Sequence, residues 1–254
     1  AFSSRSFLLS FFRAIESFIC RMPDFFLCSS GESCQILEKD FQVSPDKIML
    51  LEDIVPDRVF AASQAAQKTR FQELVPPKKQ VVLYTGSLLP GKGVQHIFQA
   101  IKLLCVKRQD IFFVLVGYPL EHAEACIHRQ QLERFCLLPG QVAYYNLSDW
   151  LALGDIALEP KKADSGEASG KLLHYMAAGL PVVCFATANN QKMLGDAGYY
   201  APSCDGQGLA AGIEAALADG EQARSRGEQG RERIRARYSS AAAGKLLHKV
   251  YGRF

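Results

Sequence analysis

From residue 81 onward, short apolar runs alternate with segments whose apolar residues recur at helical spacing. Most of the apolar runs carry no polar position on either face, which is typical of strands in a sheet covered by helices on both sides. The runs predict strands at 81–85, 111–116, 142–145, 156–159, 182–186 and 199–201. Alternation of this kind indicates a parallel sheet with crossover helices.

The segments between these strands have helical periodicity. Helices are expected at 94–107, 120–136, 171–178 and 209–218. Gly179 and Pro181 separate the third helix from the next strand, since glycine favours a helix end and proline cannot continue a helix. The fold class predicted for this region is therefore α/β, a Rossmann-like doubly wound parallel sheet.

A smaller, partial α/β unit precedes the large one. Within residues 23–60, PDFFLCSS is predicted as a strand and turn, GESCQILEKDF as a helix and DKIMLLED as a second strand. The polar segment before residue 81 contains Pro76 and Pro77, which block a helix and mark a linker. The predicted domains are 1–62, a linker at 63–80, 81–238, and a C-terminal helix at 239–254 that follows a break near Ser239.

The first apolar segment, FLLSFFRAIESFIC at residues 7–20, has helical spacing and is interrupted by Arg13 and Glu16. It predicts an amphipathic helix, which packs on a core in the first interpretation and lies on a membrane surface in the second. No apolar run reaches roughly 18 residues, the length of a membrane span, and a signal peptide is not indicated. The chain opens on Ala1 instead of methionine, and we expect it to be a fragment.

Composition narrows the classes of function. The chain has 254 residues, of which 48% are hydrophobic and 22% charged, as in ordinary globular proteins. Its net charge of +3 is small and scattered, which argues against a nucleic-acid partner. The eight cysteines occur singly, and several lie inside apolar runs that indicate buried thiols, which suits a reducing cytoplasm. His122, Cys126 and His128 lack a fourth ligand and are interpreted as a helix surface, so no metal site is predicted.

The stretch YTGSLLPGKGV at residues 84–94 has the glycine and lysine spacing of a P-loop. A P-loop requires Ser or Thr after the lysine as a magnesium ligand, whereas Gly93 follows Lys92 here. The neighbouring strand also ends in Gly117 instead of the aspartate that a nucleoside triphosphatase needs. What remains is a strand, a turn with Lys92 and a helix start, which either binds another anion or is a plain glycine-rich turn.

A second loop of this type leaves the strand at 156–159 and enters a helix near Gly170. Ser169 is a natural N-cap, and Lys171 adds a positive charge in the first turn. Both loops follow the carboxyl ends of parallel strands, where doubly wound sheets bind their ligands. Two cation-bearing turns at one edge of a sheet indicate a site for a diphosphate.

Four stretches carry a family resemblance in the expected order: VVLYTGSLLPGKGVQHIFQAIKLL, FFVLVG, DIALEP and GEASGKLLHYMAAGLPVVCF. Together they resemble the C-terminal, nucleotide-sugar-binding domain of family 4 (group 1) retaining glycosyltransferases of the GT-B fold. The segment PDFFLCSS…VSPDKIMLLEDIVPDRVF is similar to the end of that family's N-terminal domain. The resemblance covers roughly residues 23–254.

The resemblance also implies site residues. The family's first loop carries an arginine and a lysine that face the donor diphosphate. The lysine corresponds to Lys92, whereas Ser87 stands in the arginine position. The family's signature pairs two glutamates eight positions apart. Glu167 matches the first, near the sugar, and His174 falls where the ribose-binding second one is expected, with one residue fewer between them. Catalytic roles are thereby expected for Lys92 and Glu167, and donor binding for Gly86, Ser87, Gly91, Gly93, Asp164, Ser169, Gly170, Lys171 and His174.

The implied function is transfer of a sugar from a UDP- or GDP-type donor to an acceptor hydroxyl with retention, without a metal or cofactor. The acceptor is expected to be a saccharide or a lipid-linked molecule, in the cytoplasm or at the inner face of a membrane. We expect this chain to lack most of the acceptor half, and therefore to transfer little by itself. The alternative is a non-catalytic nucleotide-sugar-binding or scaffold protein on a degenerate transferase fold. A nucleotide-sugar epimerase is disfavoured, since Tyr-x-x-x-Lys does not occur.

Overall fold

The structure is a computed structural model that describes residues 7–61, 71–162 and 170–252. These residues form two compact units. The smaller unit comprises 7–53 and 243–252, and the larger comprises 54–61, 71–162 and 170–242. The boundaries expected at residues 62, 80 and 238 remain a prediction.

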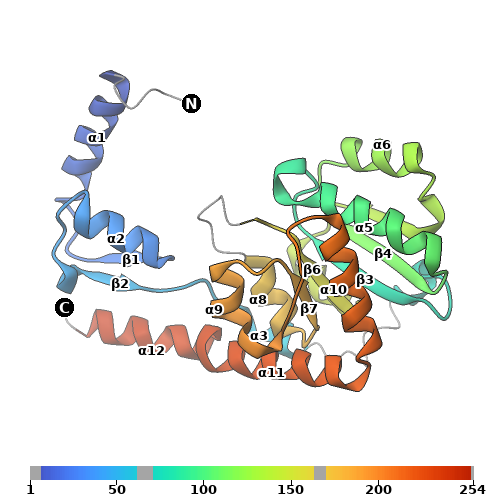
Figure 1. The fold of residues 1–254 in the computed structure, drawn as a ribbon. Helices are drawn as coiled ribbons and strands as arrows, with labels where there is room; N and C mark the ends of the chain where they lie inside the picture. Colours follow the sequence, from blue (N-terminus) through green and yellow to red (C-terminus); the bar gives the residue numbers. More distant parts are fainter. Residues whose placement is uncertain (1–6, 62–70, 163–169, 253–254) are drawn as a thin grey trace. The chain divides into compact units, whose positions relative to one another are not determined.

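The larger unit is built on a parallel sheet of six strands, in the order β5-β4-β3-β6-β7-β8 (Figure 1). The strands are β3 (Gln80–Thr85), β4 (Ile111–Val116), β5 (Cys136–Gly140), β6 (Ile156–Glu159), β7 (Val182–Cys184) and β8 (Gly198–Tyr200). From β3 the chain winds outward to β5, then returns to β6 and winds outward on the other side. The point where the order reverses therefore lies between β3 and β6, and the predicted doubly wound α/β class is confirmed.

Helices cover both faces of this sheet, and alternate side chains of β3 mark the two cores. Val82 and Tyr84 pack in the core that also contains buried side chains of α5, α6 and α10. Val81 and Leu83 pack in the opposite core, with α3, α7, α8 and α11. The helices are α3 (Asp57–Ala61), α5 (Val94–Lys107), α6 (Glu121–Gln130), α7 (Leu147–Leu151), α8 (Gly170–Ala177), α9 (Ala188–Leu194), α10 (Gly206–Ala218) and α11 (Glu221–Tyr238). Short 3-10 turns are η2 (Gln72–Leu74), η3 (Pro90–Lys92), η4 (Glu133–Phe135), η5 (Tyr144–Asn146) and η7 (Gly195–Ala197).

The strand predicted at 142–145 is wrong. The third strand of the larger unit is β5, and Tyr144 lies in the 3-10 turn η5. β5 is an edge strand that pairs with β4 alone, with an irregular register before Gly140. Pro139 is tolerated there because an edge strand has one unpaired side, where a missing N–H costs little. The helix expected at 120–136 is correspondingly shorter, because Gln131 adopts a left-handed φ of 56° and ends α6.

The predicted break near Ser239 is confirmed. α11 ends at Tyr238, Ser239 is extended, and α12 (Ser240–Tyr251) begins directly afterwards. Ser239 Oγ accepts a hydrogen bond from the N–H of Ala242 at 3.2 Å, which caps the new helix. Val55 pairs with Ser239 in an isolated bridge, and its N–H donates to the Tyr238 carbonyl at 2.9 Å. The chain just after the smaller unit is thus fixed to the end of α11.

The smaller unit contains the expected strand, helix and strand. β1 (Phe26–Cys28) and β2 (Ile48–Leu50) pair in parallel, with α2 (Gly31–Lys39) between them and the 3-10 turn η1 (Pro45–Lys47) before β2. Ser30 caps α2, since its side-chain oxygen accepts from the N–H of Ser33 at 3.1 Å. This part of the prediction is confirmed.

The apolar segment near the start of the chain forms α1 (Phe7–Ile19), as predicted. The phenylalanine side chains from residue 11 onward, however, are exposed: 53% for Phe11, 58% for Phe12 and 65% for Phe18. Ile15 and Ile19, on the same helical face, are also exposed. The interpretation of a helix packed on a core is therefore wrong for these side chains. None of the helices in the described ranges is long and apolar enough to cross a membrane.

Candidate functional site

Two turns meet at the carboxyl ends of β3 and β6. The first runs from Gly86 through η3 to Gly93, where α5 begins. Gly93 has a left-handed φ of 87°, and a Cβ there would lie 2.2 Å from the carbonyl oxygen of Pro160. Pro160 directly follows β6, so the start of α5 touches the loop that leads toward α8. The first predicted anion-binding turn therefore contacts the described beginning of the second, at Pro160.

The end of β4 supports the first turn from the other side. The N–H of Gly86 donates to the Val116 carbonyl at 2.9 Å, and the N–H of Leu88 donates to the Tyr118 carbonyl at 2.9 Å. A Cβ on Gly117 would lie 1.7 Å from the Gly86 carbonyl oxygen, so the two backbones are in direct contact. A nucleoside triphosphatase would have an aspartate at this position. Gly117 stands here instead, and its lack of a side chain lets the two backbones pack together.

Lys171, in the first turn of α8, lies against the first turn. Its Nζ is 3.6 Å from Glu159 Oε2 and donates to the Tyr84 hydroxyl at 3.3 Å. The same ammonium lies 4.6 Å from the centre of the Tyr84 ring, within the range of a cation–π contact. A Cβ built on Gly86 would be 3.6 Å from Nζ. The positive charge of α8 therefore lies directly beside the turn that follows β3.

Burial lowers the pKa of Lys171, and the nearby positive charges of Lys161 and Lys92 lower it further, while Glu159 raises it. The Lys171 side chain is 17% exposed, whereas Glu159 is fully buried. Lys92 of the first turn and Lys161 after β6 thus both act electrostatically on Lys171 of α8. This is the positive potential that a diphosphate would require.

Ser87, which stands where the family has an arginine, stabilises the turn. Its carbonyl accepts a hydrogen bond from the Tyr84 hydroxyl at 2.8 Å, and its Oγ accepts from the N–H of Leu89 at 3.4 Å. No described atom lies within 4 Å of a Cβ added at Gly91 or Gly170. An anion would be stabilised by backbone N–H groups at the start of a helix such as α8.

His174 is held by contacts on both ring nitrogens. Nδ1 lies 2.8 Å from the Gly170 carbonyl, which can only accept, so Nδ1 carries the proton in the neutral ring. Nε2 then accepts a hydrogen bond from the Tyr144 hydroxyl at 2.8 Å. Tyr144 was not anticipated as a site residue because its segment was predicted as a strand. In the structure Tyr144 and Tyr145 are both exposed, unlike the residues of a strand that is buried on both faces.

Three predicted site residues, Asp164, Glu167 and Ser169, lie outside the described residues. Their roles, including the catalytic role of Glu167, remain predictions. Cys126, from the segment interpreted as a helix surface, is buried in α6. Among the residues that the structure describes, no three His, Cys, Asp or Glu side chains gather as metal ligands.

The hydroxyl of Tyr175 accepts a hydrogen bond from the last residue of β3, at the point where the strand order reverses. β6 pairs with β3 only as far as Leu83, so the N–H of Thr85 has no strand partner on that side. It donates instead to the Tyr175 hydroxyl at 2.7 Å, and Thr85 Oγ1 lies 3.1 Å from the same hydroxyl. Burial raises the pKa of Tyr175, which keeps its hydroxyl neutral. α8 is thus joined to the end of β3.

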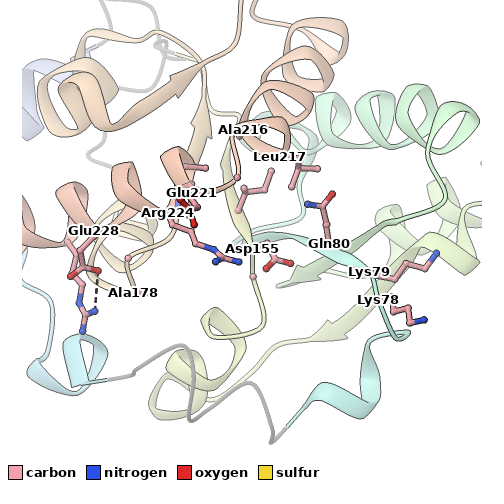
Figure 2. Close-up of a pocket in the computed structure, with 17 residues that line it drawn as sticks. Lys78, Lys79, Gln80, Asp155, Ala178, Ala216, Leu217, Glu221, Arg224 and Glu228 are labelled. Carbon is pink, nitrogen blue, oxygen red and sulfur yellow. Dashed lines mark hydrogen bonds and ion pairs between the residues drawn. The ribbon is translucent and has the colours of Figure 1, made fainter.

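A cavity of about 930 Å³ lies at the opposite, amino-terminal edge of the sheet (Figure 2). It is lined by the starts of β3 and β6, including Gln80 and Asp155, and by Glu228 and Arg231 of α11, which form an ion pair at 3.4 Å. Doubly wound proteins bind their ligands at the carboxyl ends of strands. We therefore place the candidate site at the two turns and not in this cavity.

The strand order, with two helix starts at its reversal point, is that of a doubly wound α/β domain that binds its ligand at the carboxyl edge. The profile of the family described as "Glycosyl transferases group 1" matches residues 79–219, more than half of the chain. The chain belongs to the group 1 glycosyl transferases, in agreement with the resemblance in its sequence.

Two curated relatives are transferases. Alpha-D-kanosaminyltransferase of Streptomyces kanamyceticus is 22% identical over 220 residues, which cover 85% of this chain and 56% of the relative. The phosphatidylinositol N-acetylglucosaminyltransferase GPI3 subunit of Saccharomyces cerevisiae (strain YJM789) is 25% identical over 149 residues, 58% of this chain and 32% of the relative. The chain thus spans about half the length of the first relative and a third of the second.

Solved structures share the fold at low identity. HepE of Anabaena, in complex with UDP, is 15% identical with a TM-score of 0.80, covering 99% of this chain and 70% of that one. Sucrose-phosphate synthase of Thermosynechococcus elongatus is 20% identical with a TM-score of 0.76, covering 98% and 63%. The C-terminal domain of a group 1 glycosyl transferase from Francisella tularensis is 18% identical with a TM-score of 0.63, covering 73% and 99%. The GT-B architecture expected from the resemblance is the fold of these neighbours.

Proposed function

We propose that the chain binds a nucleotide-diphosphate sugar at the β3/β6 reversal point and serves in its transfer to an acceptor hydroxyl with retention. The observation that carries the proposal is the convergence of Lys171 with the turn that holds Gly86, Lys92 and Gly93. The HepE structures contain UDP, UDP-glucose, or UDP and glucose, which supports a UDP-type donor over a GDP-type one.

Departure of the diphosphate is the demanding event in such a transfer. Negative charge grows on the leaving oxygen, and fixed donors at that position stabilise the transition state. We assign this task to Lys92, to the N–H groups near Gly91 and Gly93, and to the start of α8 at Gly170. Glu167 is assigned to the sugar. No metal and no cofactor is assigned to this transfer. Transfer itself is proposed for this chain together with an acceptor-side domain, with a saccharide or a lipid-linked molecule as acceptor.

A second candidate is a non-catalytic nucleotide-sugar-binding or scaffold protein. One observation favours it: the single acceptor nitrogen of His174 is already engaged by Tyr144, so it is not available to a ribose diol. A carboxylate in that position would offer two acceptor oxygens. Donor hydrolysis measured alongside nucleotide titration separates the candidates: a non-catalytic binding protein shows binding without hydrolysis, and a scaffold that has lost its site shows neither.

The proposed function predicts the effect of Lys171→Gln. Glutamine removes the positive charge but keeps an N–H donor for the buried Glu159. We expect the dissociation constant for UDP, measured by isothermal titration calorimetry, to rise roughly tenfold to a hundredfold, because hydrogen bonds to charged groups contribute about 1.5–3 kcal/mol.

Lys102→Gln is the matched control, because Lys102 is an exposed lysine of α5. Its affinity for UDP should equal that of the unchanged protein. The same titration with GDP establishes which base is preferred. Equal affinities of the two variants for UDP would show that Lys171 is not part of the site. If the unchanged protein bound neither UDP nor GDP, the proposed function would be wrong.

For the acceptor side, we propose that the exposed apolar face of α1 contacts a membrane surface, as at the inner face of a cytoplasmic membrane. Phe12→Ser combined with Phe18→Ser should lower cosedimentation with phosphatidylglycerol–phosphatidylcholine vesicles by roughly tenfold or more, because burying one Phe contributes about 1.5–3 kcal/mol. Val106→Ser, at an apolar position of α5 that is 82% exposed, is the control. Equal sedimentation of the two variants would show that α1 does not make this contact.

A further inference from the structure

A carboxylate lies beneath the proposed donor site. Glu159 is the last residue of β6 and is fully buried. Its Oε2 lies 3.6 Å from Lys171 Nζ, and its Oε1 accepts a hydrogen bond from the N–H of Lys161 at 3.2 Å. A buried charge is costly unless it is paired and hydrogen-bonded. A buried carboxylate at the carboxyl end of a central strand therefore requires a structural or functional explanation.

We propose that Glu159 is a positioning residue of the donor site, which holds the charged amine of Lys171 against Tyr84 and beside the Gly86 turn, where the donor diphosphate binds. The inference rests on the proposed function. Because Glu159 has no exposed surface, it acts on the donor through Lys171 and not by contact. The aromatic face of Tyr84 and the carboxylate of Glu159 hold the amine from two strands, β3 and β6.

The electrostatics explain why the amine needs this support. Among the described residues, the charged groups that act on Lys171 are Lys161 after β6, Lys92 of η3 and Glu159. The first two lower the pKa of Lys171, as burial does, and Glu159 opposes all three effects. Tyr84, from β3, stays neutral because burial raises its pKa. Without Glu159 the amine would lose its proton at a lower pH, and its attraction for a diphosphate would weaken as the pH rises through that value.

Glu159→Gln tests the inference, because it removes the charge with little change of shape. Lysine carbons labelled with ¹³C at Cε report the titration of Lys171 by NMR without nucleotide, and the signal is assigned by its loss in Lys171→Gln. Across about pH 7 to pH 11, which brackets the ordinary lysine pKa, we expect the midpoint to move to lower pH. UDP affinity should fall by roughly tenfold and its pH dependence should move with the midpoint.

Two further variants complete the design. Glu159→Asp keeps the negative charge but moves it away from the Lys171 amine, so it should give an intermediate midpoint and an intermediate UDP affinity. It replaces Glu159→Gln if that variant does not fold. Glu232→Gln, at an exposed glutamate of α11, should leave the midpoint and the affinity unchanged.

The outcomes separate the two proposals. An unmoved Lys171 midpoint with intact UDP binding would overturn the role of Glu159 and leave the proposed function standing. A moved midpoint in a protein that binds neither UDP nor GDP would overturn the proposed function, and the donor role of Glu159 with it. A midpoint and an affinity that change together support both.

Discussion

Gly93→Ala is expected to lower the free energy of unfolding by about 2–5 kcal/mol and to abolish measurable UDP binding. Two effects add. A left-handed φ is unfavourable for any residue with a Cβ, and the new methyl would lie 2.2 Å from the Pro160 carbonyl oxygen. That oxygen belongs to the backbone after β6, so it cannot yield as a flexible side chain would. The start of α5 must therefore move away from the loop that leads to α8.

Gly91→Ala is the control in the same turn, because an added Cβ meets no described atom within 4 Å and its φ is not left-handed. Urea denaturation of both variants measures the difference in stability, and titration with UDP measures the binding. A Gly93→Ala protein as stable as Gly91→Ala would show that the two turns do not touch as described.

Tyr175→Phe is expected to cost about 1–3 kcal/mol of unfolding free energy, the usual cost of leaving a buried donor unsatisfied. The change removes only the hydroxyl, which accepts from the N–H of Thr85 at 2.7 Å. The N–H of Gly86 donates toward β4, so that of Thr85 points to the β6 side, where the strands have already separated. In the described structure the hydroxyl is the acceptor that replaces a strand at this position.

Tyr145→Phe serves as its control, because the Tyr145 side chain is 68% exposed and its hydroxyl can bond to water. The midpoints of urea denaturation, compared at equal slope, give the two costs. Equal values would mean that Thr85 finds another acceptor when the hydroxyl of Tyr175 is lost.

Most of the sheet could be predicted because its strands are apolar on both faces and so leave uninterrupted runs in the sequence. α5 was predicted with its observed bounds, since a glycine precedes it and its buried residues follow helical spacing. β5 was missed for the opposite reason: it is a partly exposed edge strand that contains Pro139. α9 was missed although Thr187, which caps it through the N–H of Asn190, was a readable helix start.

The candidate site was predictable in part. The positions of the two turns follow from the parallel sheet, because consecutive crossovers bring carboxyl ends to one edge. The pairing of Lys171 with Glu159 was not anticipated, since it depends on how deeply each side chain is buried. A charged residue at the end of the apolar run of β6 was the available signal. Likewise, the hydrogen bond between His174 and Tyr144 joins positions that no local spacing relates.

The strand pair β1–β2 contrasts with the six-stranded sheet. Each of its strands has three residues, and Leu27 of β1 and Ile36 of α2 are 45% and 43% exposed. A two-stranded sheet is at best marginally stable in water, and parallel strands are normally covered on both faces. The two units of the chain should therefore not melt in one cooperative transition. A single melting temperature would describe the larger unit, while the amides of β1 and β2 would already exchange with solvent at lower temperature.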